Sequence, residues 1–194
     1  MPIFDHFGII APFYDRAIPL NHAEKLIQVI DLPTQGALLD AGGGTGRVAE
    51  AMREMASSVI VADVSFKMLL QAREKNGLRL VNSHTEVLPF RDEYFKRVIM
   101  VDALHHVCDH KETTSELWRV LKPGGRLVIE EPDVRTFTVK LVAMAEKLAL
   151  MRSHFIKPPD IAALFPYPDA QIEIIKDGFN AWIVIEKSNS TYPG

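Results

Sequence analysis

The sequence predicts an α/β fold in which a largely parallel sheet is covered by helices on both faces. Short apolar, β-rich runs alternate with segments whose apolar residues recur at helical spacing. Near the end of the chain the pattern changes, because two β-rich runs flank Asp177-Gly178, a pair typical of a tight antiparallel turn. Together these observations predict a doubly wound sheet that finishes in a hairpin.

Five strands are expected before the hairpin, each an apolar run bounded by turn residues. They are Ala37–Ala41, Val59–Asp63, Leu78–Asn82, Arg97–Asp102 and Arg126–Glu131. Helical spacing predicts the covering helices Arg47–Met55, Phe66–Lys75, Lys111–Leu121 and, rich in apolar residues, about Arg135–Met151. The hairpin strands are expected over Gln171–Lys176 and Ala181–Lys187.

The helix over Lys111–Leu121 has the clearest boundaries. Asp109 and Glu112 have the spacing of a capping box, in which each side chain satisfies a backbone N–H of the first turn. Pro123-Gly124-Gly125 then ends the helix and leads the chain into the next strand.

Composition restricts the classes of protein. The 194 residues are 47% hydrophobic and suit one domain over 1–194. With 22 basic and 25 acidic side chains there is no basic field to hold nucleic acid. The single cysteine, Cys108, suits a reducing cytoplasm. The chain start lacks the pattern of a signal peptide and no apolar run could span a membrane, so we expect a soluble, cytoplasmic protein.

The most informative stretch is LLDAGGGTGRVAE, where an apolar strand is followed by a glycine-rich turn and a helix. The candidate binding positions in it are Asp40, Gly42, Gly43, Gly44 and Gly46. Glycines permit positive φ and close approach of a ligand, and N–H groups at a helix start favour an anion. In a doubly wound sheet this position is the ligand-binding crevice.

The turn is compatible with two kinds of nucleotide cofactor. Gly44–Ala49 satisfies the permissive G-x-G-x-x-[GA] pattern of dinucleotide sites, and Asp63 at the end of the second strand would bind ribose hydroxyls in either case. Asp40 discriminates between them, because a dinucleotide diphosphate gains nothing from an acid two residues before Gly42, whereas a ligand with an amino group does.

Four segments in order resemble the class I S-adenosylmethionine-dependent methyltransferases, most closely the small-molecule type (methyltransferase type 11) that includes quinone-biosynthesis enzymes. They are LLDAGGGTGR, VADVSFKML, EVLPF with the strand leading into VDALHHV, and LWRVLKPGGRLVIEEP, within residues 36–131. The resemblance implies S-adenosylmethionine as cofactor and a Rossmann-like seven-stranded sheet of order 3-2-1-4-5-7-6 with strand 7 antiparallel, in agreement with the hairpin.

The resemblance also implies roles on the methionine side of the cofactor. Asp40 and Gly42 would meet the amino group, Gly44 and Gly46 would lie on the carboxylate side, and Gly43 completes the turn. On the other side of the cofactor, Asp63 would hold the ribose while Val64 and Met68 flank the adenine.

The adenine-side segment departs from the family pattern. Where the family usually has an aspartate that receives the adenine amino group, this chain has His84, followed by Thr85 and Glu86. A neutral imidazole can accept that hydrogen bond, or Glu86 or backbone groups replace it. The alternative is that His84 is an exposed loop residue.

The candidates for chemistry follow the fourth strand. Asp102, His105 and His106 would border both cofactor and acceptor, and His105 is the first choice for a base because an imidazole can take a proton from a phenol or enol. The alternative is that the histidines only shape the wall. Although 105–110 is rich in potential ligands, adjacent ligands cannot converge on one ion, so no metal is expected.

Segments outside the 36–131 core are expected to choose the acceptor. Residues 1–30 predict an aromatic-rich lid and a helix, with Tyr14 as a second catalytic candidate because related enzymes place a similar tyrosine near the cofactor. Residues 134–167 predict a second cover with Met and Phe side chains, ahead of the hairpin at 170–187. A second copy of the chain could complete so small a site.

The expected function is methylation of oxygen or carbon in a small, largely apolar molecule such as a phenol, quinone precursor or hydroxy acid. The Asn/Asp-Pro-Pro-aromatic sequence of many amino-group methylases is missing after the fourth strand, which disfavours nitrogen acceptors and nucleic-acid bases. Two alternatives stay open at this point: an NAD-dependent oxidoreductase, and a non-catalytic regulatory protein that binds the cofactor.

Overall fold

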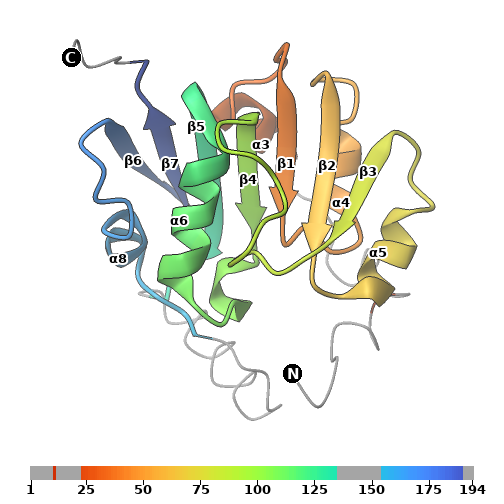
Figure 1. The fold of residues 1–194 in the computed structure, drawn as a ribbon. Coiled ribbons are helices and arrows are strands. Elements are labelled where there is room, and N and C mark those ends of the chain that lie inside the picture. Colours follow the sequence, from red (N-terminus) through yellow and green to blue (C-terminus); the bar gives the residue numbers. More distant parts are fainter. Residues whose placement is uncertain (1–10, 12–22, 135–153, 190–194) are drawn as a thin grey trace.

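The computed structural model describes residue 11 and residues 23–134 and 154–189, and its centre is a seven-stranded sheet (Figure 1). The strands are β1 (Ala37–Ala41), β2 (Ser58–Asp63), β3 (Leu78–Asn82), β4 (Phe95–Val101), β5 (Leu121–Pro132), β6 (Ala170–Asp177) and β7 (Asn180–Lys187). Their order is β3-β2-β1-β4-β5-β7-β6, and β7 is antiparallel to both its neighbours. The predicted topology is therefore confirmed.

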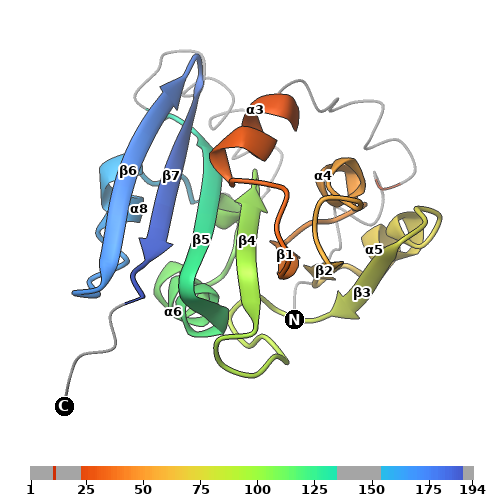
Figure 2. The same cartoon turned by 90° about the horizontal axis from the view of Figure 1, so that it is seen from above.

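Helices cover both faces of the sheet (Figure 2). The helices α3 (Ala23–Val29), α4 (Arg47–Ala51) and α5 (Phe66–Ala72) supply apolar side chains to one core cluster. The short 3-10 helix η2 (Leu104–His106), α6 (His110–Val120) and α8 (Pro158–Ala162) supply the cluster on the opposite face. With both faces buried, the central strands are nearly continuous apolar runs, which is the pattern that made them visible in the sequence.

Strand alternation decides which face each polar side chain near the strand ends enters. In β1, Leu38 belongs to the α4 face and Leu39 to the α6 face, so the side chain of Asp40 enters the α4 face. The same alternation in β5 sends Glu130 toward the α3 face and Glu131 toward the α6 face.

Two helices end earlier than their sequence pattern predicts. The helix α4 ends at Ala51 instead of Met55, and α5 ends at Ala72 instead of Lys75. Beyond each end the chain tightens into i→i+3 hydrogen bonds, from the N–H of Met55 to the carbonyl of Met52 at 2.9 Å and from Lys75 to Ala72 at 3.0 Å. Tight last turns leave the side-chain spacing almost unchanged, which is why the helical pattern continues past each end.

One half of the predicted capping box of α6 is confirmed, because the side chain of Asp109 accepts a 2.9 Å hydrogen bond from the N–H of Glu112, whereas the N–H of Asp109 donates to Glu86 at 3.3 Å. The glycine turn after α6 differs from the prediction. The strand β5 already begins at Leu121, and its register against β4 shifts opposite the Pro-Gly-Gly segment, where Gly124 has φ +67°. The segment ends the helix as predicted and forms an irregularity within the strand.

The hairpin turn lies one residue later than predicted. Asp177 pairs with Asn180, so the two turn residues are Gly178 and Phe179, and Gly178 supplies φ +60°. The helix α8 was not predicted by the sequence. The helix predicted over about 135–151 lies outside the described residues.

Candidate active site

The carboxyl ends of β1, β2 and β4 point to the same edge of the sheet (Figure 1), as parallel strands must. Three of the predicted site residues lie at this edge. Asp40 lies one residue before the end of β1, Asp63 ends β2, and Asp102 directly follows β4. The loop after β1 also contacts the segment after β4, because a Cβ added to Gly42 would lie 2.8 Å from the Cβ of Ala103.

The loop after β1 requires glycine at three positions. Gly42, Gly44 and Gly46 have φ values of +71°, +54° and +72°. Gly46 is doubly constrained, since a Cβ there would lie 2.8 Å from a methyl group of Leu78. At the base of the loop the N–H of Gly42 donates to the carbonyl of Ala62 at 2.7 Å, which ties the loop to β2.

Asp40 lies beneath this loop and is 1% exposed. A Cβ on Gly43 would fall 2.5 Å from the Asp40 carboxyl carbon, so Gly43 is needed for packing rather than for its backbone angle. Burial, and secondarily the nearby Asp63, raise the pKa of Asp40 to about 7, against the lowering effect of Arg47 and the backbone of Ala49. Within the described part of the chain, its Oδ2 has no hydrogen-bond partner.

Asp63 connects the two loops that would surround a nucleotide. One carboxylate oxygen accepts from the N–H of Gly44 at 2.9 Å and the other from the N–H of Ser65 at 2.7 Å. A carboxylate oxygen offers two acceptor directions, so these bonds are compatible with a ribose at the same group. The arrangement of glycines and Asp63 fits the cofactor predicted from the sequence.

The two predicted adenine neighbours differ in burial. Val64 is 56% exposed, whereas Met68 is 2% exposed and its sulfur would lie 3.9 Å from a Cβ on Gly44. Phe66, which follows β2 and was not singled out in the sequence, is 62% exposed. An exposed valine and phenylalanine beside the loop give this edge apolar surface that a planar base could cover.

Glu86 connects the loop after β3 to the start of α6 by hydrogen bonds. Its carboxylate accepts from the N–H of Cys108 at 2.8 Å and of Asp109 at 3.3 Å. Thr85 is buried, and its hydroxyl lies 3.3 Å from that of Thr113 on α6. His84 is largely exposed, with its Nδ1 3.8 Å from a Glu86 oxygen. The adenine contact assigned to this segment stays a prediction.

Asp102 joins the cofactor edge to the residues that follow β4. Its backbone has φ +51°, uncommon for a residue other than glycine, and its N–H donates to the carbonyl of Glu130 at 3.0 Å. Burial and the neighbouring Glu130 and Glu131 raise the pKa of Asp102 to about 6. An Arg47 nitrogen lies 3.9 Å from its carboxylate.

His105 forms a buried pair with Glu131, a residue that the sequence pattern did not single out. Its Nδ1 lies 2.5 Å from one carboxylate oxygen of Glu131, and the other oxygen accepts from the N–H of Leu104 at 2.7 Å. Both side chains are nearly inaccessible, at 5% and 3% exposure. The available signal was alternation in β5, which places Glu131 on the α6 face beside the end of β4.

The rings of Phe155 and His106 contact the ring of His105. Its ring stacks on Phe155 at 4.3 Å between centroids, and its carbonyl accepts from the N–H of His154 at 2.7 Å. His154 and Phe155 both belong to the cover predicted over 134–167. His106 lies 3.9 Å from His105 between ring centroids, and burial together with that imidazole lowers the pKa of His106 to about 3.

Other residues predicted from the sequence are not placed by the structure. Tyr14 and most of the predicted lid at 1–30 lie outside the described residues. Among the residues that are described, no group of three or more His, Cys, Asp or Glu side chains could hold a metal ion. In the same part of the chain, no helix is both long and apolar enough to cross a membrane.

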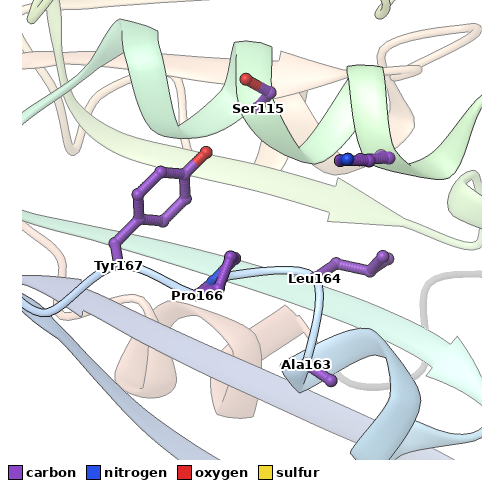
Figure 3. A pocket seen from close by; sticks show the side chains of 6 residues that line it. Ser115, Ala163, Leu164, Pro166 and Tyr167 are labelled. Carbon is purple, nitrogen blue, oxygen red and sulfur yellow. The ribbon is translucent and has the colours of Figure 1, made fainter.

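A separate depression of about 300 Å³ lies between α6 and the segment after α8 (Figure 3). Pro166, Leu164 and Tyr167 form its apolar wall, and Lys111 and Ser115 line it from α6. Both α6 residues are exposed, so the polar groups here are solvated, in contrast to the buried Glu131 and His105. The residues that line the depression therefore include no buried titratable side chain of the kind found at the sheet edge.

Comparison with known proteins agrees with this geometry. Residues 39–129 match the family described as "Methyltransferase domain". The ubiquinone/menaquinone biosynthesis C-methyltransferase UbiE of Serratia proteamaculans is 36% identical over 104 residues, which cover 48% of this chain and 41% of the relative. The UbiE of Francisella philomiragia is 33% identical over 121 residues, 57% of this chain and 46% of that protein. The chain thus spans less than half the length of these relatives.

Solved structures match over nearly the whole chain. A SAM-dependent methyltransferase from Aquifex aeolicus superposes with a TM-score of 0.73 at 16% identity, covering 94% of this chain and 98% of that one. A chain from the complex between the Haloferax volcanii Trm112 methyltransferase activator and a methyltransferase gives a TM-score of 0.79 at 16% identity, covering 96% and 99%. At such identities the likeness concerns the fold.

Sheet order, loop geometry and domain match define the class, a class I S-adenosylmethionine-dependent methyltransferase fold. Within that class, residues 39–129 match the methyltransferase domain family, and the chain is similar to its UbiE relatives over about half of its length. S-adenosylmethionine is the cofactor that the family and the fold imply.

Proposed function

We propose that this chain transfers the methyl group of S-adenosylmethionine to carbon or oxygen of a small, largely apolar acceptor such as a phenol, a quinone precursor or a hydroxy acid. The observation that carries the proposal is the position of the buried His105–Glu131 pair: His105 follows β4 and Glu131 lies near the end of β5, on the sheet that bears the glycine loop. The C-methyltransferase activity of the UbiE relatives favours carbon over oxygen.

The proposed chemistry divides the edge into a holding side and a reacting side. When bound, S-adenosylmethionine supplies an electrophilic methyl group on a sulfonium, which needs no further activation. Asp63 would hold the ribose, and the loop from Gly42 to Gly46 would receive the methionine part. Asp40 would meet the amino group of that part, and Asp102 would border the cofactor.

His105 would act as the base. Its imidazole would take the acceptor's proton as the methyl group is transferred, and bound S-adenosylmethionine would supply that methyl group and leave as S-adenosylhomocysteine. Burial of the pair keeps water from competing with the acceptor. Tyr14 stays a second candidate for this side, and the cover at 134–167 would favour an apolar acceptor.

Calorimetric titration with S-adenosylmethionine, S-adenosylhomocysteine and NADH tests the cofactor. We expect binding of the first two and none of NADH, and NADH binding alone would revive the oxidoreductase alternative. A screen of phenols, hydroquinones and hydroxy acids with methyl-labelled cofactor then tests the activity. Tight cofactor binding with no transfer to any of them would favour the non-catalytic regulatory alternative.

The proposal includes a cytoplasmic location and, as an option, a homodimer whose second copy completes the acceptor side. The lone Cys108 suits a reducing compartment. Sedimentation of the full chain with and without S-adenosylhomocysteine would show whether the chain dimerises and whether the ligand changes that state.

A further inference from the structure

Glu131 uses both of its carboxylate oxygens on the segment that carries the proposed base. Oε1 accepts from the N–H of Leu104 at 2.7 Å, and Oε2 faces Nδ1 of His105 at 2.5 Å. Since a carboxylate only accepts hydrogen bonds, the proton between Glu131 and His105 belongs to Nδ1. In a neutral ring the lone pair then lies on Nε2, the nitrogen on the far side from Glu131.

We propose that Glu131 is a positioning residue that fixes His105 in the tautomer with the proton on Nδ1. The catalytic consequence rests on the proposed function, because only that tautomer offers Nε2 as a base. The tautomer itself is a property of the folded chain and can be measured without any acceptor.

The surroundings of the ring support a single orientation. Phe155 lies nearly parallel to the imidazole, with 13° between the planes. The carbonyl of His105 is held by the N–H of His154 at 2.7 Å. A rotated ring would place a carbon toward the Glu131 oxygen and lose a buried hydrogen bond. Packing and hydrogen bonding thus favour the same ring position.

The substitution Glu131→Gln separates the shape of this residue from its chemistry. The N–H of Leu104 is a fixed donor, so the amide oxygen of the introduced glutamine must take the position of Oε1. The NH₂ group of the glutamine then faces Nδ1 of His105 and can only donate to it. Nδ1 must become the acceptor and the ring proton must move to Nε2. The variant therefore reverses the tautomer and removes the base with almost no change in volume.

Glu130→Gln is the matched control on the same strand. Glu130 is also buried, at 5% exposure, but its side chain enters the opposite face, where Asn180 donates to it at 2.7 Å. A glutamine there keeps an oxygen for Asn180. Both glutamates raise the pKa of Asp102, so each variant removes a negative charge near that residue, and only one of them contacts His105.

The experiment is nitrogen NMR of the full chain labelled with ¹⁵N-histidine, with S-adenosylhomocysteine, for wild type and both variants. A His105→Gln sample assigns the signals. We expect protonated Nδ1 and unprotonated Nε2 in wild type and in Glu130→Gln, and the reverse in Glu131→Gln. A wild-type ring with its proton on Nε2, or an unchanged tautomer in Glu131→Gln, overturns the proposal. If Glu131→Gln does not fold, the wild-type tautomer alone decides.

Kinetics then connect the tautomer to the reaction. With an acceptor from the screen, we expect Glu131→Gln to lower kcat roughly 100-fold relative to Glu130→Gln, with KM for S-adenosylmethionine unchanged. The limb of the pH profile that reports the base should also disappear. A tautomer reversal with unchanged kcat would contradict the role of His105 as base and leave the positioning by Glu131 intact. No transfer by wild type would contradict the proposed function instead.

Discussion

The two halves of the proposed site are built in different ways. After β1 and β2 the edge consists of backbone, with three glycines at positive φ and N–H groups held by Asp63. At the ends of β4 and β5 it consists of buried side chains that are far apart in sequence, since His105 and Glu131 are separated by 26 residues. The first half therefore depends on glycine at fixed positions. The second half depends on two side chains that form a hydrogen-bonded pair across neighbouring strands.

The strongest test of the backbone half compares two glycines in the same loop. Gly46→Ala combines positive φ with a 2.8 Å contact to Leu78, whereas Gly44→Ala meets nothing closer than 3.9 Å. We expect a loss of about 3 kcal/mol of stability for Gly46→Ala and about 1–2 kcal/mol for Gly44→Ala, where only the backbone conformation is penalised. Urea unfolding measures both, and equal losses would mean that the Leu78 contact relaxes without cost.

Asp40 makes the stability of the backbone half depend on pH. Its folded pKa of about 7 lies above the unfolded value, so between these values the folded state holds a proton that the unfolded state has lost. The free energy of unfolding therefore falls as pH rises toward 7. In Asp40→Asn this contribution is gone, and the stability of the variant relative to wild type should rise by about 2–3 kcal/mol between about pH 5 and pH 9.

Urea unfolding of both proteins at the two pH values provides the measurement. Differences that do not depend on protonation cancel in the comparison. A constant difference between wild type and Asp40→Asn would show that Asp40 is ionised in the folded chain across this range.

Asp63 is the point at which the two loops of the backbone half meet. Asp63→Ala removes the carboxylate that would hold the ribose and leaves the N–H groups of Gly44 and Ser65 without this acceptor. We expect affinity for S-adenosylhomocysteine to fall by about 2 kcal/mol, roughly 30-fold in Kd. Calorimetry gives the value, with circular dichroism as a check on folding. An unchanged Kd would remove the ribose assignment.

Much of the backbone half could be predicted from the sequence because its requirements fall on consecutive residues. A run of glycines after an apolar strand predicts a turn with positive φ angles. Asp63 could be predicted as a site residue because it ends the next strand. The predicted ends of α4 and α5 were wrong because tight turns keep helical side-chain spacing. The irregularity in β5 depends on pairing with β4, which local composition does not encode.

The side-chain half was only partly visible in the sequence. His105 could be predicted from its position after the fourth strand, but Glu131 becomes its partner only through the pairing of β4 with β5 and the alternation within β5. Likewise, the sequence offers Glu86 only as an alternative to His84 for the adenine contact, which stays a prediction, and gives no sign that its carboxylate accepts from the N–H groups of Cys108 and Asp109. Such partners require the sheet register before they can be named.

The adenine-side segment gives the last and smallest comparison. Glu86→Ala leaves two backbone N–H groups without their acceptor, so we expect a loss of about 1–2 kcal/mol of stability. His84→Ala removes a side chain that is 62% exposed, and its effect on stability should stay within about 0.5 kcal/mol.

The same two variants decide the role of each residue toward the cofactor. If His84 accepts from adenine, His84→Ala should raise the Kd for S-adenosylhomocysteine several-fold while the stability of the chain is unchanged. If Glu86 only connects the β3 loop to α6, Glu86→Ala should lower the free energy of unfolding. The loss of binding free energy for S-adenosylhomocysteine should then be no larger than that loss of stability. Because the two effects fall on different measurements, thermal unfolding and calorimetry on both variants separate a ligand contact from a structural one.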